Sequence, residues 1–142
     1  MNFIDIKYHY SGLDKIEAIP NGDMIDLRSA IDYDLKSGEF ALIDLGVSMK
    51  LPEGYYAILL PRSSTFKKYG IIQTNSVGII DNSYSGDNDI WMMPVLAMRD
   101  THISRNDRIC QFTIIPKEKF ILHTVDHLSS IDRGRFGSTG TK

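Results

Sequence analysis

Cysteine, long hydrophobic runs and surplus charge are all scarce in this chain of 142 residues. The single cysteine, Cys110, excludes an internal disulfide and fits a reducing compartment. Because no apolar run is long enough for a membrane span or a signal peptide, we expect a cytoplasmic protein that does not bind membranes. A formal net charge of -2 argues against nucleic acid as a partner, since nucleic-acid binders usually carry a basic surplus.

Helical periodicity is also rare. No stretch of ten or more residues repeats apolar side chains at the helical period, and the 4 histidines lack metal-ligand spacing. The one helix that we expect is short and runs from Ser64 to about Tyr69. Ser63 or Ser64 would cap its first turn, and Gly70 would end it.

What the chain has instead is a series of short segments typical of strands. The spacing of these segments and of the turns between them predicts a single all-β sandwich or barrel. A change of register between Phe40–Leu42 and Leu45–Leu51 predicts a bulge or a bend. The other expected strands are 3–10, Tyr55–Leu60, Ile90–Met98, Arg108–Ile115 and Phe120–Val125. We predict one domain over residues 1–128 and a flexible C-terminal arm over 129–142, because the arm is rich in Ser, Asp, Arg, Gly and Thr.

Five polar segments punctuated by glycine interrupt these strands. They supply arginines, hydroxyls and glycine backbone for a polyphosphate, one carboxylate, and aromatic rings for a base and a sugar. The segments are Gly22–Leu27, Pro61–Ile71, Gly78–Asp87, Arg108–Phe112 and Arg133–Gly140. In order and chemistry they resemble the five motifs of the trimeric deoxyuridine triphosphatases (dUTPases), from about residue 22 to residue 140. The resemblance implies a jelly-roll-like β-barrel, a homotrimer with active sites shared between subunits, and hydrolysis of dUTP to dUMP and pyrophosphate.

The second segment combines an arginine with hydroxyls at the start of the expected helix, a combination that binds anions. Taken alone, Pro61–Ser64 favours a simple helix cap beside an exposed arginine over a binding site. The resemblance implies that Arg62, Ser63 and Ser64 contact the triphosphate. It extends the phosphate contacts to Gln111 and to three residues of the arm, which are Arg133, Ser138 and Thr139.

In the third segment, the pattern predicts a hairpin with Asp81 at its tip and Tyr84 on the returning strand. The alternative is a tight turn in which Asp81 caps a backbone amide. The resemblance implies that Asp81 is the general base for attack of water on the α-phosphate, and that Tyr84 lies against the deoxyribose. It also implies that the uracil is read at Asn75, Gly78 and Ile80. Mg²⁺ would be held mainly by the triphosphate and waters, with no metal ligand from the protein.

Two further expectations are open to alternatives. Asp26 would belong to the water network around the metal, or it is simply a structural aspartate at a strand end. Phe136 follows Arg133 by fewer residues than in the family, so either Phe136 or the 88–93 segment, with Trp91 or Met92, would cover the uracil. The other interpretation of Trp91 and the methionines is that they belong to the core.

The fourth motif, Arg108–Phe112, alternates as a strand with Ile109 and Gln111 on one face. Cys110 and Phe112 would lie on the other face, which makes Cys110 a small core residue rather than a nucleophile. Two other functions are compatible with the fold: a dCTP deaminase, or a protein-interaction module that senses dUTP.

Overall fold

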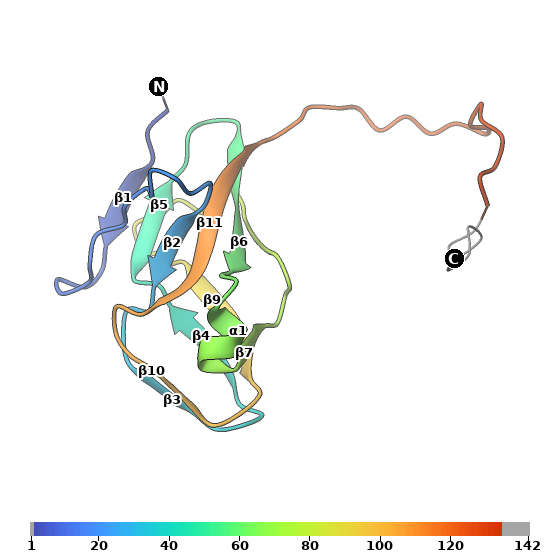
Figure 1. Ribbon diagram of the computed structural model, residues 1–142. Coiled ribbons are helices and arrows are strands. Elements are labelled where there is room, and N and C mark those ends of the chain that lie inside the picture. Colours follow the sequence, from blue (N-terminus) through green and yellow to red (C-terminus); the bar gives the residue numbers. More distant parts are fainter. Residues whose placement is uncertain (1, 135–142) are drawn as a thin grey trace.

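The computed structural model describes residues 2–134 and confirms an all-β protein with one short helix. Figure 1 shows the strands wrapped into a barrel. The elements in chain order are β1 (Asp5–Tyr8), β2 (Ile25–Arg28), β3 (Tyr33–Leu35), β4 (Phe40–Asp44), β5 (Val47–Lys50), β6 (Tyr55–Pro61), α1 (Thr65–Tyr69), β7 (Ile71–Gln73), β8 (Gly78–Ile80), β9 (Met92–Ala97), β10 (Thr101–Ile103) and β11 (Arg108–Pro116). No helix among the described residues is long and apolar enough to cross a membrane.

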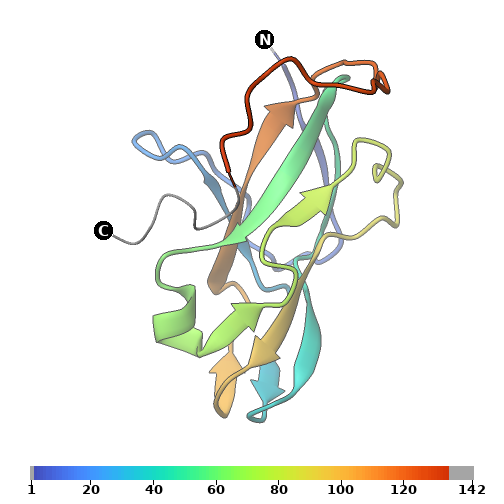
Figure 2. The ribbon, with the colours of Figure 1, turned by 90° about the vertical axis from the view of Figure 1, so that its right-hand side faces the viewer.

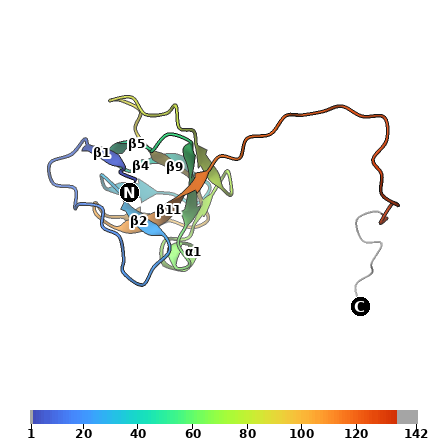
Figure 3. The same ribbon diagram turned by 90° about the horizontal axis from the view of Figure 1, so that it is seen from above.

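Antiparallel pairing organises these strands into four small sheets. A four-stranded sheet has the order β2-β11-β6-β8, and a three-stranded sheet has the order β4-β9-β7. The pairs β1-β5 and β10-β3 complete the barrel. The view from above in Figure 3 shows β1 beside β5 on one side of it. The first four motifs all lie on the four-stranded sheet or in the loops next to its strands. Arg133 lies outside this sheet.

The core fills the space between the sheets. Trp91 is fully buried and meets Phe112 edge to face, with ring centroids 5.2 Å apart. In β9 every second side chain, at Met93, Val95 and Ala97, is buried as period two requires. Burying an aromatic or branched side chain stabilises the fold by about 1.5–3 kcal/mol. Trp91 is therefore a core residue, and the suggestion that it covers the uracil is wrong.

The predicted change of register falls at Gly46, between β4 and β5. Gly46 has φ +71°, and a Cβ atom there would lie 2.6 Å from Leu13 Cδ2 and 2.9 Å from Ala30 Cβ. Its N–H donates to Asp44 Oδ1 over 2.7 Å. Both the left-handed backbone and the lack of space require glycine, so the bend is fixed by this residue.

The helix α1 forms where it was expected, and Gly70 ends it in the left-handed conformation with φ +62°. Ser64 occupies the capping position, but its side chain makes no capping hydrogen bond. Thr65 stabilises this turn instead. Its Oγ1 accepts a hydrogen bond from Arg62 N–H and donates one to Ile109 O. The predicted cap by the Ser63 or Ser64 side chain is therefore wrong, and both serines stay exposed.

Two strand predictions also fail. The register of β11 against β2 shifts between Arg108 and Cys110, so Ile109 and Cys110 are both buried and the simple alternation is broken. The expected strand Phe120–Val125 does not form. This segment has no strand partner in the described chain, and Ile121 is 93% exposed. Figures 1 and 3 show the chain after β11 extending away from the barrel.

Candidate active site

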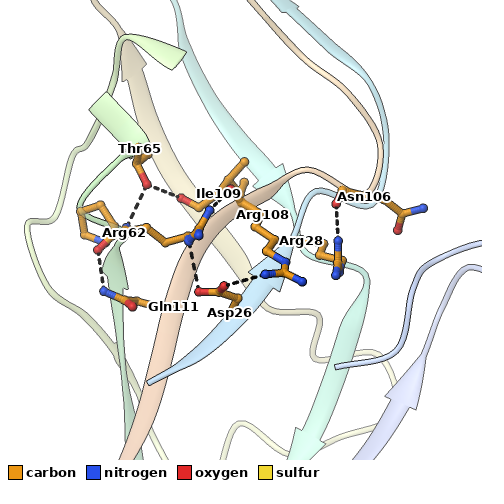
Figure 4. Close-up of polar contacts among 9 residues, drawn as sticks. Asp26, Arg28, Arg62, Thr65, Asn106, Arg108, Ile109 and Gln111 are labelled. Carbon is orange, nitrogen blue, oxygen red and sulfur yellow. Dashed lines mark hydrogen bonds and ion pairs between the residues drawn. The ribbon is translucent and has the colours of Figure 1, made fainter. Parts of the chain in front are cut away.

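One polar cluster gathers where β2, β11 and the end of β6 meet (Figure 4). Asp26 on β2 lies opposite Gln111 on β11, and Gln111 lies opposite Leu60 of β6 on its other side. Asp26 Oδ1 is 3.1 Å from Arg62 Nε, and Asp26 Oδ2 is 3.7 Å from Arg108 Nη1. The Asp26 side chain is only 12% exposed. One carboxylate thus holds two guanidinium groups from different motifs.

The second motif presents Arg62 and the two serines together. Arg62 N–H donates to Thr65 Oγ1, and Arg62 Nη1 donates to Arg108 O over 3.2 Å. Gln111 Nε2 donates to Pro61 O over 3.1 Å, which brings the fourth motif against the second. Arg62 and Ser63 also line a hollow of about 440 Å³. A guanidinium beside exposed hydroxyls is well suited to bind phosphate oxygens.

The Asp81 turn lies at the far side of the same sheet. Tyr84 N–H donates to Asp81 O over 3.0 Å, which closes the turn directly after β8. Asn82 Nδ2 donates to Pro52 O and Tyr55 O and so ties the turn to the loop before β6. The predicted hairpin is wrong, because residues 81–91 form no strand and β9 pairs with β4 and β7.

The Asp81 carboxylate is exposed and accepts no hydrogen bond from the residues that the structure describes, so the alternative in which it caps an amide is not formed. It stands at the rim of a hollow of about 360 Å³, a size in the range of small-molecule sites. The hollow is lined by Ile79, Ile80, Asp81, Ser83, Tyr84, Ile90 and Met92. Tyr84 Oη donates to Ile90 O over 2.8 Å, which anchors the end of a side chain that lines this hollow. An apolar hollow with a carboxylate at its rim can hold a base and a sugar beside a reactive water.

The remaining uracil candidates lie just before this turn. Gly78 is buried, and a Cβ atom there would lie 3.1 Å from Leu59 Cβ, so glycine lets β8 approach β6 closely. Asn75 is exposed in the loop that leads into β8. Met92 is 37% exposed and lines the same hollow as Tyr84, unlike the buried Trp91.

A single chain keeps the two halves of the candidate site apart. Asp81 directly follows Ile80 of β8, and Ile80 pairs with Ala57 of β6. Arg62 lies five residues after Ala57, beyond the end of β6. Figure 2 shows β8 alongside β6 with the helix at the other end. At ~3.3 Å per residue this separation is about 16 Å. This backbone separation is larger than a single phosphate group. Arg133 is exposed on the extended segment, and Phe136, Ser138 and Thr139 lie outside the described residues.

Comparison with known proteins decides the family. The sequence model of the dUTPase family matches residues 21–141. The chain is 54% identical to the SPbeta prophage-derived deoxyuridine 5'-triphosphate nucleotidohydrolase YosS of Bacillus subtilis, over 98% of this chain and 99% of that protein. The chain belongs to the dUTPase family. It is also 38% identical to the deoxyuridine 5'-triphosphate nucleotidohydrolase of Neorickettsia sennetsu, over 83% of this chain and 81% of that protein.

Solved dUTPase structures share the fold. A mutant dUTPase of Staphylococcus bacteriophage 80alpha, solved with dUpNHpp, matches 99% of this chain and 100% of its own with a TM-score of 0.84 at 21% identity. The dUTPase of Streptococcus mutans matches 82% of this chain and 98% of its own with a TM-score of 0.71 at 21% identity. These similarities confirm the jelly-roll-like barrel expected from the motifs.

Several residues of this dUTPase site were not assigned a role from the sequence. Arg108 lies within the fourth motif, yet only the pairing of β2 with β11 brings it to Asp26. Thr65 and Asn82 adjoin candidate residues and could have been noticed as polar positions beside them. Cys110 is confirmed as a core residue, because it is fully buried. Burial raises the pKa of its thiol above the ordinary value, and the nearby Asp26 raises it further. Such a thiol is not a nucleophile at neutral pH.

Proposed function

We propose that this dUTPase family member hydrolyses dUTP to dUMP and pyrophosphate. Its relatives are named deoxyuridine 5'-triphosphate nucleotidohydrolases. The observation that carries the proposal is the exposed Asp81 carboxylate, which lines the hollow beside Tyr84 and accepts no hydrogen bond from residues 2–134. Asp81 orients a water molecule and takes its proton as the water oxygen attacks the α-phosphorus. The bond from the α-phosphorus to the bridging oxygen breaks, and pyrophosphate leaves. General-base help of this kind contributes about 10²–10⁴-fold.

The arginine cluster supplies the anion site. Arg62, Ser63 and Ser64 contact the triphosphate, with the Ser63 hydroxyl near the bridging oxygen, and Gln111 assists them. Asp26 keeps Arg62 and Arg108 in place through the contacts at 3.1 and 3.7 Å. Donors fixed before substrate arrives stabilise the charge that develops on the leaving oxygen.

Selectivity arises around the Asp81 turn. The backbone of Gly78 and Ile80 and the side chain of Asn75 read the uracil, and Met92 covers part of it. Tyr84 lies against the deoxyribose, so a ribose hydroxyl would be buried against the ring without a hydrogen-bond partner. An unsatisfied polar group of that kind costs about 1–3 kcal/mol, which disfavours UTP.

Members of the dUTPase family generally use a divalent metal, and we propose Mg²⁺ for this chain. In residues 2–134 no group of three or more His, Cys, Asp and Glu side chains could hold a metal ion. A metal held mainly by the triphosphate and waters fits this donor set, with Asp26 acting on it only through water. When bound, such a metal would neutralise part of the negative charge of the triphosphate.

We propose that the complete site uses more than one copy of the chain, in the homotrimer of the family. Two observations support this. The Asp81 turn and the Arg62 cluster lie about 16 Å apart along one chain, and apolar side chains of the extended segment are exposed. The exposed side chains include Phe120, Ile121, Leu122, Leu128 and Ile131. The arm beyond residue 128, with Arg133, Phe136, Ser138 and Thr139, would close over the nucleotide bound at a neighbouring subunit.

The single Cys110, buried and without a disulfide partner, supports a cytoplasmic location for this activity. Pyrophosphate release from dUTP, UTP, dCTP and dTTP tests the proposed function. Only dUTP should be turned over at a high rate. Ammonia released from dCTP would instead identify a deaminase, and tight dUTP binding without turnover would identify a sensing module.

A further inference from the structure

A buried glutamine at the end of β7 is hydrogen-bonded to the side chain of Asn75. Gln73 is only 4% exposed. Its Nε2 donates two hydrogen bonds of 2.9 Å each, one to Leu59 O and one to Asn75 Oδ1. One buried amide nitrogen thus connects the backbone of β6 to an exposed side chain of the loop before β8.

The donors and acceptors of these two hydrogen bonds allow one orientation of the Gln73 and Asn75 amide groups. Leu59 O is a backbone carbonyl and can only accept, so the NH₂ group of Gln73 must face it. The same NH₂ group faces Asn75, so Asn75 must turn its Oδ1 inward and its Nδ2 outward. Gln73 Oε1 is buried and has no hydrogen-bond partner among the described residues, which is a cost that an apolar side chain would avoid.

The outward Nδ2 of Asn75 is a free donor beside the strand proposed to read the base. It makes no hydrogen bond within residues 2–134, and a Cβ atom built on Gly78 would lie 3.5 Å from it. A donor at this place matches the carbonyl oxygen at position 4 of uracil. Cytosine has an amino group there, so two donors would face each other without an acceptor.

We propose that Gln73 is a positioning residue for base selection. By holding Asn75 Oδ1 inward, it makes Asn75 present a donor to the pyrimidine and so favours uracil over cytosine. This inference rests on the proposed hydrolysis of dUTP and assigns part of its selectivity to a side chain that does not touch the base. Without Gln73 the Asn75 amide could rotate by half a turn and offer Oδ1 to the amino group of cytosine.

Two variants test the inference, each with kcat and KM measured separately for dUTP and dCTP. Asn75→Asp keeps an oxygen for Gln73 Nε2 and turns a second oxygen outward, so the base meets an acceptor instead of a donor. Because Asn75 is exposed, this variant is expected to fold. The ratio of kcat/KM for dUTP to that for dCTP should fall at least about 10-fold. Asn21→Asp adds the same charge in another exposed loop and should leave the ratio unchanged.

Gln73→Met keeps the approximate volume of the side chain but removes the donor. The Asn75 amide is then free to rotate, so the ratio should again fall about 10-fold, mainly because dCTP is turned over better. The inhibition constant of dCTP against dUTP hydrolysis should fall in parallel. An unchanged ratio in Asn75→Asp, or a Gln73→Met variant that loses dUTP and dCTP turnover equally, would overturn the inference. Failure of the wild-type chain to hydrolyse dUTP would contradict the proposed function itself.

Discussion

The ion pair between Asp26 and Arg62 should stabilise the folded protein measurably. The two side chains are 12% and 28% exposed, and Asp26 Oδ1 lies 3.1 Å from Arg62 Nε. An exposed pair contributes about 0–1 kcal/mol, whereas breaking a buried pair costs about 3–5 kcal/mol. This pair is intermediate in burial and has additional hydrogen bonding through Arg62 Nη1. We therefore expect a coupling free energy of about 1–2 kcal/mol.

A double-mutant cycle measures this coupling. Asp26→Asn, Arg62→Met and the double variant are unfolded with denaturant at one fixed protein concentration, because subunit association contributes to apparent stability. The pair Lys36–Asp100 serves as the control, since its side chains are 79% and 69% exposed and 3.8 Å apart. Its coupling should be below about 0.5 kcal/mol. A coupling between Asp26 and Arg62 no larger than that of the control would refute the reasoning.

Three further predictions concern other parts of the molecule. Asn82→Ala removes both bonds that anchor the Asp81 turn, so kcat for dUTP should fall about 10-fold with little change in KM; an equal loss in the exposed-loop control Asn88→Ala would contradict this. The hydrogen bond to Asp34 raises the pKa of His102 above 6.5, so its stabilising effect is present below about pH 6.5 and is lost as pH rises through the raised pKa. The melting temperature of His102→Gln should therefore lie below that of the wild type at pH 5.5 but match it at pH 9, and the same difference at both pH values would exclude this role. Burial raises the pKa of the Cys110 thiol, so iodoacetamide should label it at pH 8 only after unfolding, and rapid labelling of the native protein would show that the site is open.

Much of the fold could be predicted from local sequence. Alternating apolar residues located β6 and β9, and the change of register before Leu45 located the bend at Gly46. Composition was misleading for Phe120–Val125, where apolar and β-branched residues indicate a strand but no partner strand lies within reach in the described chain. The pattern also missed the bulge at Ile109, because two consecutive buried residues look like a break in alternation only once the pairing is known.

The residues of the candidate site could be predicted from the sequence, but their arrangement in space could not. Asp81, Tyr84 and the second motif could be selected from their chemistry and order along the chain. Their division between two sides of one sheet depends on β6 pairing with both β8 and β11, which are distant in sequence. The contacts of Asp26 with Arg62 and Arg108 depend on the same long-range pairing. Local patterns contain no information on such pairings.

The most direct test of the account is the turnover of dUTP by Asp81→Asn. Asparagine keeps the size of the side chain and most of its hydrogen bonding, but it cannot accept the proton from water. Pyrophosphate release should fall at least about 100-fold, while a non-hydrolysable dUTP analogue still binds as it does to the wild type. A variant that retains more than about a tenth of the wild-type turnover has lost less than general-base catalysis normally contributes. In that case Asp81 is not the base and the proposed mechanism is wrong.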